Sequence, residues 1–173
     1  MKLHEYQSKR LFAERGIPIP RGEVAVTPQE ARCIAEELGE PVVVKAQVLV
    51  GGRGKAGGVR PAQTPAEAEQ AAAAVLALEI KGLPVRRVLV EEAADVDWEI
   101  YLGLAIDRAA RRPVLMASAA GGMDIEEVAR TRPDAIHRIP IDPFLGLRPY
   151  QTLALAKGVG LATEQRIPFE CMA

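Results

Sequence analysis

The stretch that decides the fold is VVVKAQVLVGGRGKAGGV, residues 42–59. Its first half is a short apolar run of the kind found in strands buried on both faces, and Lys45 is the single charge in it. Its second half places five glycines around Arg53 and Lys55. Because an extended pattern resumes at residues 59–61, the stretch predicts a strand, a glycine loop and a return strand.

The glycine loop has the composition of a phosphate-binding loop. Glycine lets backbone N–H groups approach an anion closely, and Lys or Arg charge replaces the water that a polyphosphate loses. Residues 52–57 match the GxGxxG string of dinucleotide-binding folds, but no helix follows. The Walker pattern also fails, because Leu49 and Ala56 replace its first glycine and its hydroxyl residue. The alternative is a mobile hairpin tip with incidental charges.

Lys45 lies on the strand that leads into this loop. An ammonium group among apolar side chains is tolerated when a nucleotide phosphate is its counter-ion, so we expect Lys45 to contact phosphate. The alternative is a lysine whose side chain extends from a sheet edge into water. The whole prediction requires that Lys45 and the glycine loop converge on one polyphosphate.

Two helices have the same start signal, Thr-Pro-x-Glu, which combines an N-cap hydroxyl, a first-turn proline and a capping-box glutamate. One is predicted from Thr27 to Gly39 and the other from Thr64 to Gly82. A third, amphipathic helix is expected over residues 3–14 and a fourth after residue 149. Further strands are expected at 85–92, 97–107, 113–118 and 135–141. This alternation predicts an α/β or α+β sandwich.

Acidic residues surround the strand predicted over DWEIYLGLAID, residues 97–107. Alternation along that strand places Glu99 on the polar face, opposite Trp98 and the other large apolar side chains. The preceding strand ends at Glu91 and Glu92 and continues as an acidic connection. That connection is either a solvated turn or a hinge whose backbone groups contact a purine base.

Length and composition exclude several classes of protein. The chain has 173 residues and a net charge of −1, and it is 49% hydrophobic and 26% charged, which predicts a folded globular protein without a basic surface for nucleic acid or anionic lipid. The longest apolar run, AAAAVLAL, is far shorter than the roughly 18 residues that a membrane span needs. The N-terminus lacks the apolar segment of a secretory signal, so we expect a cytoplasmic protein.

Taken in order, these residues resemble the N-terminal part of the β subunit of succinyl-CoA synthetase (succinate–CoA ligase, ADP- or GDP-forming). The likeness weakens after Lys157 and runs through LHEYQSKRLFAERGIPIPRG, VVVKAQVLVGGRGKAGGV, VLVEEAADVDWEIYLG, DRAARRPVLMASAAGGMDIEEVA and IDPFLGLRPYQ. The resemblance implies an ATP-grasp fold of two lobes with a nucleotide between them, incomplete at the C-terminus. It implies a partial ATP-grasp domain over residues 1–173, with about 21–95 as the smaller lobe and the C-terminal CoA-ligase domain absent.

Position by position, the resemblance implies a set of residues that bind the nucleotide: Lys45 at the phosphates; Gly52, Arg53 and Gly54 in the loop over them; Glu91 and Ala94 in the base pocket; and Glu99 at the ribose hydroxyls. The implied cofactors are ATP/ADP or GTP/GDP with Mg²⁺, whose ligands in the family come after residue 173. No metal ligand and no catalytic residue is therefore expected in this chain.

The function implied by the resemblance is the nucleotide-binding part of an enzyme of the tricarboxylic acid cycle. That enzyme couples succinyl-CoA, nucleoside diphosphate and phosphate to succinate, CoA and nucleoside triphosphate through a phosphohistidine on its α subunit. The α subunit is the expected partner, in a heterodimer or heterotetramer, and the chain alone is expected to be inactive. Two alternatives remain: the β subunit of a related acid–CoA ligase such as malate–CoA ligase, and a truncated, non-catalytic module for nucleotide binding or subunit assembly.

Overall fold

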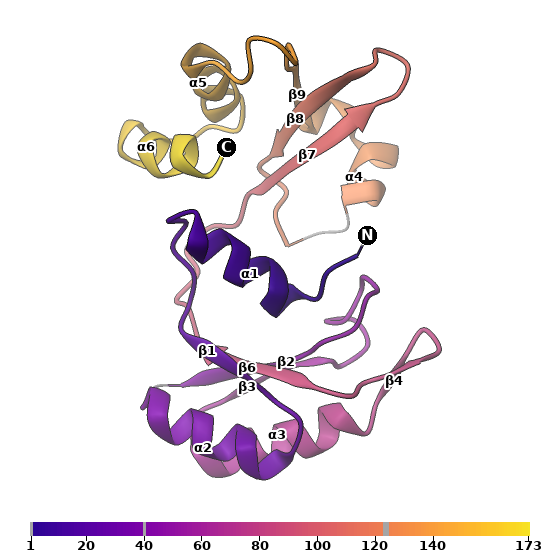
Figure 1. The fold of residues 1–173 in the computed structure, drawn as a ribbon, viewed down its shortest axis with the longest axis vertical. Coiled ribbons are helices and arrows are strands. Elements are labelled where there is room, and N and C mark those ends of the chain that lie inside the picture. Colours follow the sequence, from indigo (N-terminus) through magenta and orange to yellow (C-terminus); the bar gives the residue numbers. More distant parts are fainter. Residues whose placement is uncertain (1, 40, 123–124) are drawn as a thin grey trace. The chain divides into compact units, whose positions relative to one another are not determined.

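The computed structural model describes residues 2–39, 41–122 and 125–173 (Figure 1). It divides the chain into two compact units, Met1–Asp95 and Val96–Ala173. Each unit has a sheet and a hydrophobic core of its own. Within the described ranges, no helix combines the length and the hydropathy that a bilayer span requires.

The first unit is a four-stranded antiparallel sheet with helices on both faces. Its elements are α1 (Glu5–Glu14), β1 (Gly22–Ala25), α2 (Pro28–Leu38), β2 (Val42–Ala46), β3 (Val59–Ala62), α3 (Pro65–Leu76), β4 (Glu79–Ile80), β5 (Leu83–Pro84) and β6 (Val88–Glu92). The strand order is β1-β6-β2-β3, while β4 and β5 form a separate two-stranded hairpin. Helices α2 and α3 cover one face of the four-stranded sheet, and α1 lies over the other (Figure 1).

The two predicted helix starts are confirmed. The Thr27 hydroxyl accepts a hydrogen bond from the Glu30 backbone N–H, and the Glu30 carboxylate accepts one from the Thr27 backbone N–H. The Thr64 hydroxyl likewise accepts a hydrogen bond from the Glu67 backbone N–H. The predicted capping box is wrong at this second helix, because the Glu67 carboxylate accepts from the Gln63 backbone N–H instead of from Thr64. These caps satisfy backbone donors that the first turn of a helix leaves unpaired, so the positions of α2 and α3 follow from local sequence.

The predicted end of α3 is wrong. The helix ends at Leu76 rather than at Gly82, because residues 79–84 pair with each other as the β4–β5 hairpin. The strand–loop–strand prediction is confirmed, since β2 and β3 pair antiparallel with Lys45 opposite Val59. The position of β2 between β6 and β3 agrees with its apolar sequence.

Alternation along β2 and β6 separates the core of the first unit from its polar face. Val42 and Val44 on β2, and Val88 and Val90 on β6, belong to the core formed with α2 and α3. The side chains between them point to the opposite face, where α1 lies. The core contains many small residues at the helix–sheet contact, among them Ala31, Ala35, Ala68, Ala71 and Ala72.

Over its described residues, the second unit has a three-stranded antiparallel sheet, three α-helices and one short 3-10 helix. Its elements are β7 (Tyr101–Asp107), β8 (Arg112–Ser118), α4 (Ile125–Thr131), a short 3-10 helix (Pro133–Ala135), β9 (His137–Pro140), α5 (Pro149–Gly158) and α6 (Thr163–Met172). The strand order is β7-β8-β9. Leu115 of β8 packs with Leu155, Val159 and Phe169 of the helical segment in its core.

The first strand of this unit is shorter than predicted. Pairing begins at Tyr101 opposite Ser118, so residues 97–100 lie outside the strand. Of the predicted apolar face, Leu102 packs against the core, whereas Leu104 and Ile106 are 65% and 66% exposed. The β7–β8 hairpin extends beyond the helices of the unit, which explains why its far end is exposed on both faces (Figure 1).

Candidate functional site

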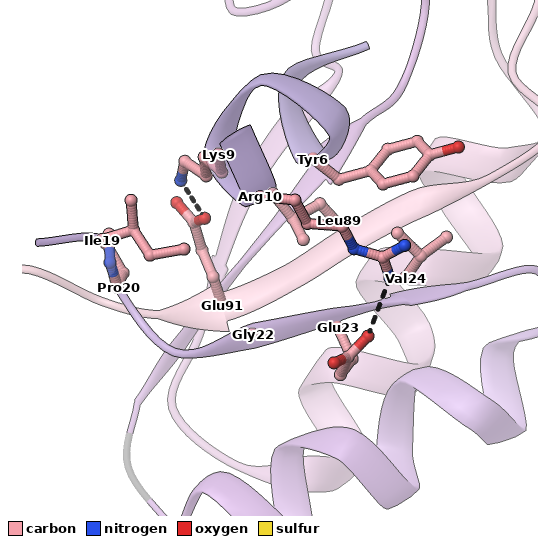
Figure 2. Close-up of a pocket in the computed structure, with 10 residues that line it drawn as sticks. All are labelled: Tyr6, Lys9, Arg10, Ile19, Pro20, Gly22, Glu23, Val24, Leu89 and Glu91. Carbon is pink, nitrogen blue, oxygen red and sulfur yellow. Dashed lines mark hydrogen bonds and ion pairs between the residues drawn. The ribbon is translucent and has the colours of Figure 1, made fainter. Parts of the chain in front are cut away.

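Five charged side chains meet between α1 and the sheet of the first unit, and we call them the charge cluster: Glu5, Lys9, Lys45, Arg53 and Glu91. The Lys45 Nζ atom forms an ion pair with Glu91 and lies 3.5 Å from Glu5 Oε1. The Lys9 Nζ atom also pairs with Glu91 and lies 3.4 Å from Glu5 Oε1. Arg53 Nη1 donates to Glu5 Oε2 at 2.7 Å. Figure 2 shows the pairing of Lys9 with Glu91 beneath α1.

Strand register places Lys45 beside Glu91. In the antiparallel β2–β6 pair, Val43 lies opposite Glu91 and Lys45 lies opposite Leu89. Lys45 and Glu91 are therefore diagonal neighbours on the face toward α1, within reach of long side chains. Glu91 is only 3% exposed, whereas residues 93–97 of the connection that follows are exposed. Two ammonium groups compensate the burial of Glu91.

Glu5 connects the glycine loop to the sheet. Burial by itself raises the pKa of this carboxyl, but the charges of Arg53 and Lys45, the hydrogen bond from Arg53 and the charge of Lys9 outweigh it and lower the pKa to about 2. Glu5 is therefore a carboxylate at neutral pH, and it is the shared counter-ion of the strand lysine and the loop arginine. Lys45 and the glycine loop thus converge on one anionic group, which belongs to the protein itself.

The glycine loop is held in place by its own backbone. The N–H groups of Ala56, Gly57 and Gly58 donate to carbonyl groups within residues 52–54. Arg53 Nη1 also donates to the Ala46 carbonyl at 2.8 Å, which draws the arginine back toward the sheet. Gly52 and Gly54 remain exposed on either side of it.

The charge cluster keeps unused donors. Its three cations and two carboxylates leave a net charge of +1. Lys45 has three N–H donors, of which Glu91 and Glu5 take two. Both hydrogen bonds that Arg53 donates to described residues use its Nη1 atom. Its Nε and Nη2 atoms carry further N–H donors that no described residue accepts. Both cations therefore keep donors that their contacts with Glu5 and Glu91 do not use.

Two pockets adjoin this cluster. The pocket in Figure 2, beneath α1, has a volume of about 40 Å³, far below the roughly 300–1,000 Å³ of small-molecule sites. The second has a volume of about 360 Å³ and is lined by His4, residues 47–49, Leu83, Pro84, Arg86 and Arg87. Gln47 joins this pocket to the cluster, since its Nε2 lies 3.4 Å from Glu5 Oε2.

His4 has an unusual environment at the edge of this pocket. Its Nδ1 atom is buried without a hydrogen-bond partner among the described residues. Burial, and then the charges of Arg87 and Arg53, lower the pKa of His4. The imidazole is therefore neutral at physiological pH and adds no charge to the site.

The structure brings Lys45, Arg53 and Glu91 together, with Gly52 and Gly54 on either side of the arginine. Ala94 is exposed and lies two residues after the end of β6. These positions all belong to the first unit.

Glu99 belongs to the second unit, and the reason given for its orientation is wrong. It precedes β7, so strand alternation does not apply to it. Its backbone and carboxylate lie against Gly121 and Gly122, where an added Cβ atom would overlap them. Glu99 is exposed as predicted, but a glycine pair in the loop after β8 decides how it lies.

Sequence reasoning missed two members of the cluster, Glu5 and Lys9. Both lie on the predicted N-terminal helix, four residues apart on one face. That spacing is the available signal, but it is equally typical of a solvated helix surface. Only the position of α1 over the sheet brings the two residues to Lys45 and Glu91.

Comparison with known proteins places the chain in a family. A match to the ATP-grasp domain covers residues 2–170. The chain belongs to the ATP-grasp family. The mixed α/β fold of the structure agrees with this assignment.

Two relatives are succinate–CoA ligase β subunits. The GDP-forming β subunit of Thermus thermophilus is 57% identical over 161 residues, which are 93% of this chain and 43% of that protein. The ADP-forming β subunit of Roseiflexus sp. strain RS-1 is 58% identical over 161 residues, which are 93% of this chain and 42% of that protein. The resemblance to the N-terminal ATP-grasp region of these subunits is therefore confirmed. The chain spans less than half the length of these relatives.

A solved structure has the same ATP-grasp fold. The dinucleotide forming acetyl-coenzyme A synthetase 1 of Ca. Korarchaeum cryptofilum, in complex with coenzyme A, Ca-AMPCP and HgCl+, matches with a TM-score of 0.74. The match covers 99% of this chain and 69% of that one at 21% sequence identity. At this identity the likeness concerns the fold alone.

Proposed function

We propose that this chain binds the polyphosphate of a purine nucleotide as the nucleotide-binding part of a succinate–CoA ligase β subunit. One observation supports the proposal above the others: Lys45 and Arg53, predicted from sequence to bind phosphate, share one carboxylate and keep free donors beside it. A phosphate group is the type of anion that such a pair of cations recognises. The two named relatives support the choice of enzyme.

In this proposal the protein positions the phosphates and neutralises their charge. Lys45 offers its remaining N–H to a phosphate oxygen, and Arg53 offers Nε and Nη2. Glu5 contacts both of these cations, and Glu91 contacts Lys45 together with Lys9, so the two carboxylates and Lys9 hold the cations in place. Phosphoryl transfer depends mainly on such positioning and on stabilisation of charge over the moving group.

The base and the ribose are assigned by the same proposal to Glu91, Ala94 and Glu99. ATP and GTP are both candidates, since the chain is equally similar to a GDP-forming and an ADP-forming relative. Mg²⁺ has no ligand set among the described residues, where no three His, Cys, Asp or Glu side chains are grouped to hold a metal ion. Following the resemblance, the proposal assigns no metal ligand and no catalytic residue to residues 1–173. It treats residues of about 21–95 as the smaller lobe of the partial ATP-grasp domain.

The enzyme that we propose couples succinyl-CoA, nucleoside diphosphate and phosphate to succinate, CoA and nucleoside triphosphate in the cytoplasm. It requires an α subunit that carries the phosphohistidine. The alternatives are a related acid–CoA ligase, such as a malate–CoA ligase, and a non-catalytic module for nucleotide binding or assembly.

An activity assay distinguishes the enzyme from the module. ADP release from ATP, CoA and succinate by the chain mixed with an α subunit supports the enzyme. Nucleotide binding without turnover in any pairing supports the module.

Calorimetric titration of the chain with ADP, GDP, AMP and adenosine tests the binding proposal. We expect Lys45→Met to weaken ADP binding roughly tenfold or more, because a charge-assisted hydrogen bond is lost, and to leave adenosine binding unchanged. Lys157→Met is the matched control, since Lys157 is an exposed lysine of the second unit. Unchanged ADP affinity in Lys45→Met with a folded far-UV spectrum would exclude the assigned role.

A further inference from the structure

The β4–β5 hairpin brings a lysine to the glycine loop. Its two turn residues, Lys81 and Gly82, have φ angles of +50° and +78°. Two consecutive left-handed residues are typical of the tight turns of two-residue hairpins, where Asn and Gly are preferred. A lysine in this conformation is strained, and such residues concentrate at functional sites. The strain alone identifies no ligand, but it raises the question of where the side chain lies.

The hairpin packs against the base of the loop. Ile80 is 2% exposed, and a Cβ atom added to Gly58 would lie only 2.9 Å from Ile80 Cδ1 and 3.1 Å from Ala46 Cβ. Gly58 is therefore a place where β4 and β2 approach the loop so closely that an added side chain would require its neighbours to shift. The Val85 N–H donates to the Leu78 carbonyl at 3.0 Å and closes the hairpin. The turn is thus held at a fixed position beside the loop.

The ammonium group of Lys81 lies against the loop backbone. A Cβ atom added to Gly52 would have Lys81 Nζ as its nearest neighbour at 3.7 Å, followed by Lys81 Cε at 3.9 Å. Gly52 directly precedes Arg53, so the ammonium group lies next to the part of the loop proposed to hold phosphate. Lys81 makes no ion pair or hydrogen bond with another described residue. Its three N–H donors are available to a ligand.

We propose that Lys81 is a third phosphate-binding cation, which binds the nucleotide polyphosphate beside Gly52 of the glycine loop. The inference rests on the proposed function and extends it to a second element of the fold. The β2–β3 loop and the β4–β5 turn then act as two walls of one anion site. An anion between the two side chains also offsets the repulsion between the ammonium group of Lys81 and the guanidinium group of Arg53.

The substitution Lys81→Asn separates charge from backbone strain. Asparagine adopts left-handed φ angles more readily than lysine, so the variant should fold at least as well as the unmutated chain. We expect its affinity for ATP and for inorganic tripolyphosphate to fall roughly tenfold in calorimetric titrations, as for the loss of one charge-assisted hydrogen bond. Adenosine binding should not change. Lys81→Arg keeps the charge and should stay within about threefold of the unmutated chain.

The outcomes distinguish this inference from the proposed function. If Lys45→Met loses ATP binding while Lys81→Asn retains it within about twofold, the role of Lys81 is excluded and the proposed function stands. If the unmutated chain binds neither ATP nor tripolyphosphate, both are overturned. If Lys81→Asn weakens ATP and adenosine equally, the residue supports the site without contacting phosphate, which also overturns the inference. Lys157→Met again controls for the loss of one positive charge.

Discussion

Replacing Glu5 with glutamine removes the carboxylate that Arg53, Lys45 and Lys9 share, and it keeps the size of the side chain. The pKa of Glu5 in the folded chain is about 2, against an ordinary value of 4.5. Each tenfold change in proton affinity is worth about 1.4 kcal/mol, so this displacement corresponds to roughly 3 kcal/mol of folding free energy. We expect Glu5→Gln to lower the free energy of unfolding at neutral pH by about this amount.

The pH dependence of this loss has a defined sign. A carboxyl group whose pKa is lowered by folding stabilises the folded state above its unfolded pKa, and the contribution is lost as the pH falls through the folded pKa. The stability difference between the unmutated chain and Glu5→Gln should therefore be constant from about pH 7 to 5.5 and shrink between about pH 4.5 and 2.

Urea unfolding followed by far-UV circular dichroism at about pH 7, 5.5, 4.5 and 3.5 measures this difference. Amide hydrogen exchange on β2 and β6 assigns the loss to the first unit. Glu14→Gln is the matched control, because Glu14 is an exposed residue of the same helix. A loss below about 1 kcal/mol near pH 7, or a difference that persists unchanged at pH 3.5, would refute the reasoning.

Two further predictions concern packing. Gly58→Ala should lower the free energy of unfolding by roughly 1–3 kcal/mol, because the new methyl carbon would lie only 2.9 Å from Ile80 Cδ1 and 3.1 Å from Ala46 Cβ. An unchanged urea midpoint would show that the base of the loop is not tightly packed. Phe169→Ala should cost roughly 3–5 kcal/mol, since the ring is 1% exposed among Leu155 and its neighbours in the core of the second unit. Thermal unfolding measures this effect, and an unchanged midpoint temperature would show that Phe169 does not stabilise that core.

Local chemistry explains which elements were predictable. The starts of α2 and α3 follow from caps that are complete within four residues of Thr27 and Thr64. The end of α3 and the start of β7 were not predictable in this way. In both cases the boundary depends on whether a partner strand is present: β5 pairs with residues after Leu76, and β8 has a partner for Tyr101 but not for Glu99.

The residues of the candidate site also fall into two groups, those that local sequence predicts and those that only tertiary contacts bring to the site. Lys45 and Arg53 were predictable because a charge in an apolar strand and a cation among glycines both require a local explanation. Glu5 and Lys9 have no such requirement, since charges four residues apart are ordinary on a helix surface. Glu91 was predicted only through the family resemblance, and its burial between two lysines could not be anticipated from an acidic turn sequence.

The amino-acid sequence by itself determined that a strand, a glycine loop and a return strand form a hairpin with two cations, and that this hairpin belongs to an ATP-grasp chain. Only the tertiary structure decided which charges share a counter-ion. Ion pairing depends on separations of a few ångströms and on exclusion of water. For Glu5 and Arg53, 48 residues apart in the chain, both are set by how α1 packs on the sheet rather than by any local pattern.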